Sequence, residues 1–506
     1  MPHAAAIAAI VGRDHVLSED TARAYYASDL VLWEYACPPA LVALPGTTGE
    51  VAAIARYAQE QGLVLVPRGA GLSYTGGVVS GDGDAIVLDL SRLDGVTIDA
   101  INMTVKVGAG LSWASLSKAL AGTGLRPQQL GPISGEYSTI GGAVSQNVPG
   151  HLEGVLGLEL VLADGTIATT GAGSVAGQTP FYRYFGPDLT GMFCGDGGVL
   201  GIKTAVTLRL VPERPAHFAS FSFASPLDLV DAMARIGATN LGVRMFGMDP
   251  QKNRDAAKVD ARTGAETVWN VVRQSRNPLA LMRDLLQLAR APQSLADSGW
   301  TLHLTMEAPT DAAARSILLA ARALIPAAGR EIDNVLPKAL HAKPYSVRGF
   351  VGREGERWVP IHGMVPLSVA HATMAALDQY FAAHAKPLAA NDITIGYFFS
   401  SVGAYVSMEP MFYWRDALSP LHHRYLSERN RVRFADRSNN VAARAKVAAM
   451  REDVRAIFRA HGALHAQLAR FYPYLDLLEP GTAILARRLK QALDPNRILN
   501  RGALDL

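Results

Sequence analysis

Between residues 39 and 212 of this 506-residue chain, short strand-like runs alternate with helix-like segments, and this alternation constrains the fold more than any other feature. Runs such as "LVLVPRG", "AIVLDLSRL" and "TVKVGAG" are rich in β-branched and aliphatic residues and predict strands. Residues 48–62 and 112–124 have helical periodicity, and Thr48 is the expected N-cap of the first helix. Strands with helices between them indicate an α/β or α+β domain.

Two further patterns complete this region. Asp164-Gly165 stands between two strand-like runs and predicts a hairpin turn. Residues 198–212 predict a pair of strands or one long strand. Prolines in "VPERPAHF" mark a boundary after residue 212, beyond which longer helical patterns alternate with strand-like runs. The chain is too long for one hydrophobic core, so two or more domains are expected.

Composition excludes several classes of protein. A formal charge of +3 with 18% charged residues gives no indication of a basic surface that binds nucleic acid. Two cysteines, Cys37 and Cys194, supply neither a disulfide framework nor a cysteine-based metal site, which favours a reducing compartment. The first residues lack the basic start of a signal peptide, and no apolar run approaches the about 18 residues of a transmembrane helix. A cytoplasmic location is therefore expected.

The stretch "VPRGAGLSYTGG", residues 66–77, is a glycine-rich loop between two strand-like runs. A Rossmann fingerprint would need glycine where Tyr74 stands and a helix directly afterwards, and a Walker loop would need Gly-Lys-Ser/Thr. The remaining interpretation is a nest of main-chain N–H groups that binds an anion such as a pyrophosphate. The alternative is a tight surface loop without a ligand.

Three further segments favour the ligand. "GPISGEYSTIGGAVSQNVPG", residues 131–150, is a second glycine-rich segment, and two nests can hold the two ends of a dinucleotide. A third segment spans residues 185–212, and a fourth is "DPNRILNRG", residues 494–502.

In this order and spacing, the four segments resemble the FAD-binding domain of the vanillyl-alcohol oxidase and p-cresol methylhydroxylase family, which includes D-lactate-type and glycolate-type dehydrogenase subunits. The resemblance covers residues 40–213, with a weaker likeness over 350–506. It implies an α+β protein with a two-part FAD-binding domain (1–213), a mixed-sheet substrate or cap domain (214–460) and a C-terminal segment that returns to the FAD domain (461–506).

The resemblance also implies the cofactor and its contacts. The residues expected to hold FAD are Pro67, Arg68, Gly69, Ala70, Gly71, Leu72, Ser73, Gly76, Gly77, Pro132, Ser138, Thr139, Gly141, Gly142, Asn147, Gly150, Gly201, Ile202 and Asn500.

The FAD is expected to be held without a covalent bond. Some relatives attach the flavin through a histidine in the first loop, where this chain has the hydrocarbon Leu72. The strip that carries a histidine in other relatives has Met408 and Glu409, and the second flavin segment has no cysteine. Attachment through Tyr405 or Tyr413 is the remaining alternative.

Dehydrogenation of an alcohol needs a base for the O–H proton, and a hydroxy acid also needs a cation for its carboxylate. The candidates for catalysis are His465, His362, Tyr405 and Arg470, with His465 first because it lies between a strong helix and the family-like C-terminal segment. The candidates for substrate binding are Arg244, Arg348, Tyr397, Glu409 and Tyr472, and Arg470 is also a candidate for the carboxylate.

Departures from the family narrow the substrate. Alkylphenol oxidases place a Tyr-Arg pair where this chain has Leu464 and His465, and an aspartate where it has Ile133. Both differences count against a 4-alkylphenol. The hydroxy-acid branch often carries a metal held by a histidine pair, but residues 392–410 contain no histidine, so no metal is expected.

Three interpretations follow. The first is an FAD-dependent dehydrogenase or oxidase of a small hydroxylated substrate, with a D-lactate-like 2-hydroxy acid as the leading class. The second is an aryl-alcohol or 4-alkylphenol oxidase. The third is a flavin-binding electron-relay subunit without turnover. The electron acceptor stays open between oxygen, quinone and cytochrome, and a homodimer is one possible assembly.

Overall fold

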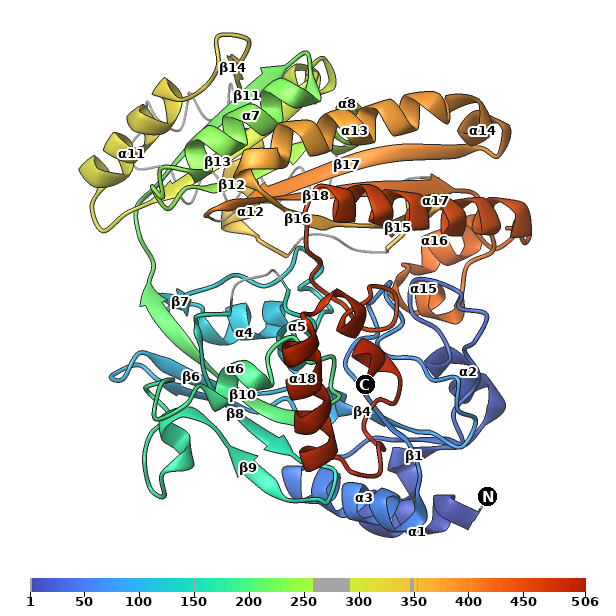
Figure 1. The fold of residues 1–506 in the computed structure, drawn as a ribbon. Coiled ribbons are helices and arrows are strands. Elements are labelled where there is room, and N and C mark those ends of the chain that lie inside the picture. The colour runs from blue at the N-terminus through green and yellow to red at the C-terminus, as the bar shows by residue number, and fades with distance from the viewer. Residues whose placement is uncertain (1, 149–151, 258–291, 346–349, 353, 402) are drawn as a thin grey trace.

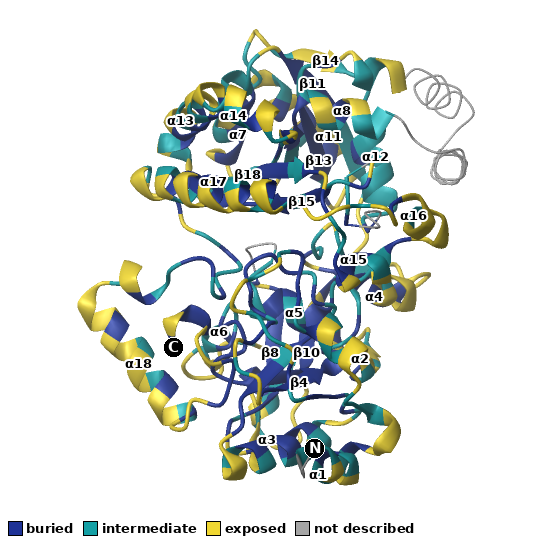
Figure 2. Cartoon of the chain, turned by 90° about the vertical axis from the view of Figure 1, so that its right-hand side faces the viewer, coloured by how far each residue is buried: buried dark blue, intermediate teal, exposed yellow. Residues whose placement is uncertain are grey.

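The computed structural model describes residues 2–148, 152–257, 292–345, 350–352, 354–401 and 403–506. The chain forms two stacked halves (Figure 1). The lower half contains two sheets and the N-terminus, and the upper half contains a third, larger sheet. Buried residues concentrate on the strands and on the inner faces of the helices in both halves (Figure 2).

The first sheet of the lower half has the order β1-β2-β4-β3, in which β2, β4 and β3 are parallel and β1 is antiparallel. β2 and β3 both pair with β4, and the helix α3 makes the crossover that joins these two parallel strands. The elements here are α1 (Pro2–Val11), β1 (Val16–Leu17), α2 (Asp20–Tyr26), β2 (Leu41–Ala43), α3 (Thr48–Gln61), β3 (Leu65–Arg68) and β4 (Ile86–Asp89).

The second sheet is antiparallel, with the order β5-β6-β10-β8-β9 and β7 paired to the end of β10. Its core contains residues of α4, α5 and the second half of β10. The elements are β5 (Val96–Asp99), β6 (Thr104–Gly108), α4 (Trp113–Leu120), β7 (Leu125–Pro127), α5 (Ile140–Ser145), β8 (Val155–Val161), β9 (Ile167–Thr169), α6 (Leu189–Met192) and β10 (Ile202–Pro212).

The third sheet forms the upper half, here called the cap, and is antiparallel throughout. Its order is β14-β11-β13-β12-β17-β18-β15, with β16 also paired to β18. The strands are β11 (Ala216–Phe223), β12 (Arg244–Met248), β13 (Trp300–Glu307), β14 (Arg330–Ile332), β15 (Arg357–Pro360), β16 (Gly363–Pro366), β17 (Ile393–Ser401) and β18 (Tyr405–Trp414).

The described helices of the cap are α7 (Pro226–Gly237), α8 (Pro250–Ala257), α11 (Asp311–Ala323), α12 (Val335–Ala342), α13 (Ala370–Ala383), α14 (Ala385–Ala390), α15 (Pro420–Tyr425), α16 (Glu428–Arg433) and α17 (Val441–Ala460). Of these, α7, α11, α13, α14, α15 and α17 bury aliphatic and aromatic side chains in one large core.

After α17 the chain descends from the cap and packs against the lower half, ending in α18 (Pro480–Leu493) and a short tail (Figure 1). Lys490 of α18 is buried and donates to the carbonyl oxygens of Val199 and Leu499 and to Asp494. These bonds attach the C-terminal segment to the loop before β10.

Most elements expected from the pattern are present, including the hairpin at Gly165, which connects β8 and β9 with φ +79°. Residues 202–212 form one long strand rather than two. The prediction of Thr48 as N-cap is wrong by one residue, because Thr47 has the extended conformation and its side chain accepts from the Glu50 N–H. One of the longer helical patterns expected after residue 212, at residues 277–296, lies partly outside the described residues.

Cys37 and Cys194 are both free. In the part of the chain that the structure describes, no helix is long and apolar enough to cross a membrane.

Candidate functional site

The loop at residues 69–77 packs closely on the second glycine-rich segment. A Cβ at Gly69 would lie 2.2 Å from Thr139 Oγ1, and a Cβ at Gly77 would lie 2.7 Å from Gln146 Nε2. Thr139 is also the N-cap of α5, where it accepts from the Gly142 N–H. Only glycine allows this approach, so the two glycine-rich segments form one surface.

This loop presents free donors. Within the described residues, the main-chain N–H groups of Ala70, Gly71 and Leu72 have no acceptor. The Nε and Nη2 atoms of Arg68 are buried without a partner, and Arg68 Nη2 lies beneath Gly71. Buried N–H groups are rarely left unpaired, so this row of donors fits an anionic group such as a pyrophosphate.

Arg68 also connects the loop to the N-terminal segment. Its Nη1 donates to the carbonyl oxygens of Tyr26 and Ser28, at 3.3 and 3.0 Å. Its guanidinium lies 5.1 Å from the ring centres of Tyr25 and Tyr26. The side chain therefore holds the loop from below while two donor atoms stay unused.

Asp29 holds the same loop and was not foreseen from the sequence. Its carboxylate accepts from the N–H of Gly76 at 2.9 Å, the N–H of Val31 and the indole of Trp33. Burial raises the pKa of Asp29 to about 6, although these three hydrogen bonds favour its charged form. No local sequence pattern marks this residue, because its partner is 47 positions away.

The C-terminal segment ties the loop to the third segment. The buried Asn500 Nδ2 donates to the carbonyl oxygens of Gly77 (2.9 Å) and Gly197 (2.6 Å). Arg470 Nη1 donates to the Gly76 oxygen, and its Nη2 donates to Asn500 Oδ1 and the Arg501 oxygen. Arg470 thus connects the glycine-rich loop to the C-terminal segment. Its contacts give no support to the predicted roles in catalysis or carboxylate binding.

The remaining expected cofactor residues lie around this surface. Pro67 packs on Gly198, Gly141 on Ala109, Gly201 on Phe193, and Asn147 on Gly195. Ser138 Oγ is hydrogen-bonded to Ser134, the Pro132 oxygen accepts from Gly135, and Ser73 Oγ accepts from the Thr75 N–H. Ile202 is buried at the start of β10. Gly150 lies outside the described residues.

A polar cluster lies where this surface meets the cap. Its centre is the hydroxyl of Tyr74, which accepts from Gln467 Nε2 at 2.9 Å and lies 3.4 Å from Glu409 Oε1 and 3.4 Å from His362 Nδ1. The hydroxyl of Tyr472 is also 3.4 Å from His362 Nδ1. The structure therefore brings three predicted residues, His362, Glu409 and Tyr472, to one loop residue that was not predicted.

Burial sets the charge of this cluster. Burial raises the pKa of Glu409 to about 7, against an opposing effect of the Lys252 charge. Burial lowers the pKa of His362 to about 3, and it raises that of Tyr74 well above its ordinary value. Near neutral pH, Glu409 is thus the group of this cluster that changes charge.

His465 extends the cluster toward a cavity. Its Nδ1 is 2.6 Å from the carbonyl oxygen of His362, which can only accept, so Nδ1 carries the proton and Nε2 keeps its lone pair. The ring stacks on Tyr472 at 4.0 Å, and burial lowers the pKa of His465 to about 4. His465 is therefore neutral near pH 7.

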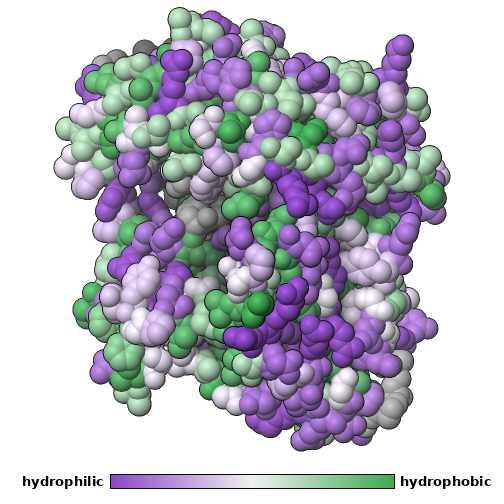
Figure 3. Space-filling view, viewed as in Figure 1, coloured by the Kyte–Doolittle hydropathy of each residue, from purple (hydrophilic) through white to green (hydrophobic). Residues whose placement is uncertain are grey.

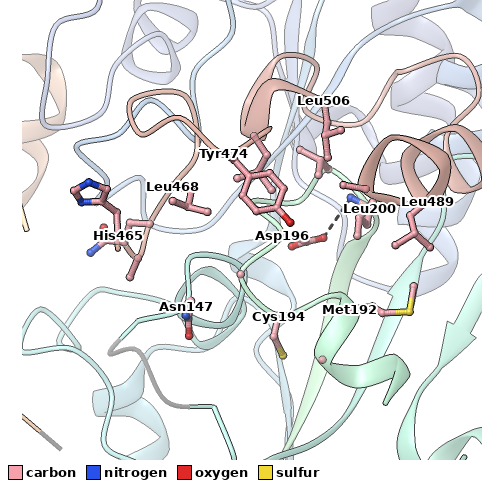
Figure 4. A pocket seen from close by; sticks show the side chains of 17 residues that line it. Asn147, Met192, Cys194, Asp196, Leu200, His465, Leu468, Tyr474, Leu489 and Leu506 are labelled. Atoms are coloured by element: carbon pink, nitrogen blue, oxygen red, sulfur yellow. Dashed lines mark hydrogen bonds between the residues drawn. The ribbon is translucent and has the colours of Figure 1, made fainter. Parts of the chain in front are cut away.

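The cavity has a volume of about 350 Å³ and lies between the C-terminal segment and residues 191–200. Figure 4 shows His465 and Asn147 toward one side and Met192 and Leu489 toward the other. Its His465 end adjoins the second cofactor segment, and its far end is apolar.

The other predicted substrate residues are dispersed. Tyr397 is buried in the cap core against Phe381 and Phe399, on the opposite side of the sheet from Glu409, so the prediction that it contacts substrate is wrong. Tyr405 lies four residues from Glu409 on the same side of β18. Arg244 is paired with Glu307 and His341. Arg348 lies outside the described residues.

Among the described residues, no three His, Cys, Asp or Glu side chains come together as a metal site.

Comparison with known proteins identifies the class. Residues 39–171 match the model of an FAD binding domain. The chain is 32% identical over 214 residues to glycolate oxidase subunit GlcD of Bacillus subtilis, which covers 40% of this chain and 43% of that protein. It is 35% identical over 207 residues to a probable mitochondrial D-lactate dehydrogenase of Danio rerio, covering 39% and 41%. The matches thus span less than half of these two relatives.

Solved structures share the whole fold at low identity. A 4-ethylphenol oxidase from Gulosibacter chungangensis aligns with a TM-score of 0.73 at 18% identity, covering 99% of this chain and 95% of that one. p-Cresol methylhydroxylase gives 0.71 at 16%, covering 99% and 96%. An alkyldihydroxyacetonephosphate synthase gives 0.69 at 17%, covering 99% and 85%.

The fold and the glycine-rich surface therefore define an FAD-binding protein with a cap. Residues 39–171 are an FAD binding domain, and the whole chain shares the fold of p-cresol methylhydroxylase. FAD is its cofactor, and nothing in the comparisons indicates a covalent bond to it.

Proposed function

We propose that the protein is an FAD-dependent oxidoreductase that dehydrogenates a small hydroxylated substrate, with a 2-hydroxy acid as the leading class. This proposal rests on one observation, the buried polar cluster beside the glycine-rich loop at residues 69–77. The cluster consists of Tyr74, His362, Glu409 and Gln467. Relatives named as glycolate oxidase subunit and D-lactate dehydrogenase support the same class.

Bound FAD supplies the hydride acceptor, its N5 atom. The chain must then take the hydroxyl proton of the substrate. His465 can do so at Nε2, because its Nδ1 proton is fixed on the His362 oxygen. Glu409 can do so in its ionised form, and Tyr74 connects Glu409 to Gln467.

A hydroxy acid also requires a cation for its carboxylate. Arg470 and Arg244 are both engaged with protein groups. Lys252 of α8 is hydrogen-bonded to Tyr413, and its charge acts on Glu409; because of its place beside Glu409 we assign it as the candidate for the carboxylate.

Anaerobic flavin bleaching tests the proposal. The purified holoprotein is mixed with D-lactate, D-mandelate or vanillyl alcohol, and the absorbance of oxidised flavin is followed. Loss of absorbance with either hydroxy acid is expected. Bleaching by vanillyl alcohol alone would move the protein to the aryl-alcohol class, and no bleaching by any of them, together with reduction by a redox protein, would make it an electron-relay subunit.

A further inference from the structure

The register of the cap sheet places a row of side chains on the same face as Glu409. Glu409 of β18 stands opposite Phe398 of β17. Phe246 of β12 stands opposite Ser400 of β17 on one side and His303 of β13 on the other. Directly opposed residues in an antiparallel pair project to the same face, and residues two apart share it. Phe398, Phe246 and His303 therefore lie beside Glu409 on the face that meets Tyr74; we call these three rings the aromatic stripe.

The rings of the aromatic stripe are stacked. The ring centres of Phe246 and Phe398 are 6.1 Å apart with an interplanar angle of 19°. Those of Phe246 and His303 are 4.7 Å apart at 25°. Phe246 and Phe398 are partly exposed, whereas Phe399, on the opposite face, is fully buried.

His303 is the buried and uncharged member of this stack. It is fully buried, its Nδ1 lies 2.8 Å from Ser220 Oγ, and its Nε2 lies 3.0 Å from Thr301 Oγ1. Burial lowers its pKa to about 3. Both nitrogens are thus occupied, so His303 offers its neighbours an apolar ring rather than a charge.

Polar groups bound the stripe at both ends. At the Glu409 end lie Tyr74 from the FAD loop and Lys252, which is over the ring of Tyr413. At the other end Arg244 pairs with Glu307, which also pairs with Arg126 of the lower half.

Figure 3 shows a hollow between the two halves. Strands are about 4.8 Å apart, so Glu409 and Phe246, two strands apart, are separated by about 10 Å across the sheet. That length exceeds the methyl group of lactate.

We propose that the aromatic stripe is the subsite for the substrate's side chain, and that this side chain is an aryl group. The inference rests on the proposed function, in which the hydroxyl lies beside Tyr74 and Glu409. Aromatic rings gain from offset stacking beyond the apolar area that they bury. The substrate class is thus an aryl-substituted hydroxy acid.

Equilibrium binding to the oxidised holoprotein tests this without turnover. Phenylpyruvate and pyruvate, the oxo acids that correspond to phenyllactate and lactate, are titrated by calorimetry. Since one added methylene already changes selectivity about 10-fold or more, we expect phenylpyruvate to bind at least about tenfold tighter. Phe398→Ala should lose most of this preference while pyruvate affinity stays the same. Phe185→Ala is the matched control, because Phe185 is 60% exposed on the lower half.

Equal binding of the two oxo acids by the unaltered protein would overturn the proposal, as would an equal loss for both in Phe398→Ala. Should Phe398→Ala fail to fold, Phe398→Leu and Phe246→Leu remove the rings while keeping apolar volume, and the same loss of preference is expected. Flavin bleaching by D-phenyllactate and D-lactate is measured in parallel. Selective phenylpyruvate binding without any bleaching would support the aryl subsite and contradict the proposed dehydrogenation.

Discussion

At the scale of the residue, the two nitrogens of His465 have separate roles, since one proton is fixed on the His362 oxygen and the other nitrogen keeps its lone pair. General bases contribute on the order of 10²–10⁴-fold to a rate. His465→Ala should therefore lower the rate of anaerobic flavin reduction by about this factor while the protein keeps its FAD. His461, which bonds the Ile457 oxygen at the end of α17, is the control for loss of a histidine. If the rate of flavin reduction falls by less than about threefold, His465 is not the general base, and Glu409 takes its place as the candidate.

Glu409 predicts a pH dependence. Burial raises its pKa from 4.5 to about 7, whereas His362 and His465 are already neutral above about pH 5. If Glu409 takes the proton, flavin reduction should accelerate as pH rises through 7, and Glu409→Gln should show no such rise. Asp29, with a pKa of about 6, titrates nearby, so Asp29→Asn is the control. A rise that persists unchanged in Glu409→Gln would exclude the assignment.

The same group makes a prediction about stability. A carboxyl with a raised pKa in the folded state keeps a proton that the unfolded chain releases. Its contribution to the free energy of unfolding is therefore present at low pH and declines as pH rises from about 4.5 to about 7. Urea midpoints measured across this range should fall less in Glu409→Gln than in the unaltered protein. Parallel declines would show that Glu409 is not the source.

Individual side chains were the hardest part of the site to predict. His362, Glu409, Tyr472 and His465 stood out as polar residues in family-like strips, and the structure brings them together. Asp29 and Gln467 did not stand out, because their partners lie 47 and 393 positions away. Tyr397 was misassigned since an alternating strand shows which residues share a face, but not which face is the core.

At the scale of the element, the first loop depends on how closely β3 and α5 approach. A Cβ at Gly69 would lie 2.2 Å from Thr139 Oγ1 and 3.2 Å from Thr139 Cβ. Overpacking costs about 1–3 kcal/mol, so Gly69→Ala should weaken FAD binding about tenfold or more. The measurement is flavin absorbance per protein after dialysis. Gly83→Ala, where a Cβ meets nothing within 4 Å, should keep full flavin; full flavin in Gly69→Ala would contradict the close approach.

The elements themselves were largely predictable, because their signals are local. Periodicity located α3 and α4, and apolar runs located β3, β4, β6 and β10, within a few residues. Sheet order was not predictable from these patterns, since β10 pairs with β6, β7 and β8 across long stretches of chain. The face that β18 presents was not predictable either, because alternation along a strand does not show which face meets the core.

At the scale of the whole molecule, Asn500 joins three parts of the chain. Asn500→Ala would leave the buried carbonyl oxygens of Gly77 and Gly197 and one Arg470 donor without partners. Each buried polar group left without a partner lowers the free energy of unfolding by roughly 1–3 kcal/mol. We expect a lower urea midpoint and faster FAD loss. Asn496→Ala, at an exposed position of the same segment, is the control and should match the unaltered protein. Equal behaviour of the two variants would contradict the role of Asn500.

The hydrogen bond between Asn500 and Gly77 joins residues 423 positions apart, and this separation bears on the order of events during protein synthesis. A chain folds from its N-terminal part while the ribosome still extends it. The glycine-rich loop can adopt its local turn early, but its hydrogen bond from Asn500 to the Gly77 oxygen waits until residue 500 has been made. Cofactor capture at full affinity is consequently a late event, and a ribosome stalled within the cap would carry a lower half that cannot yet retain flavin.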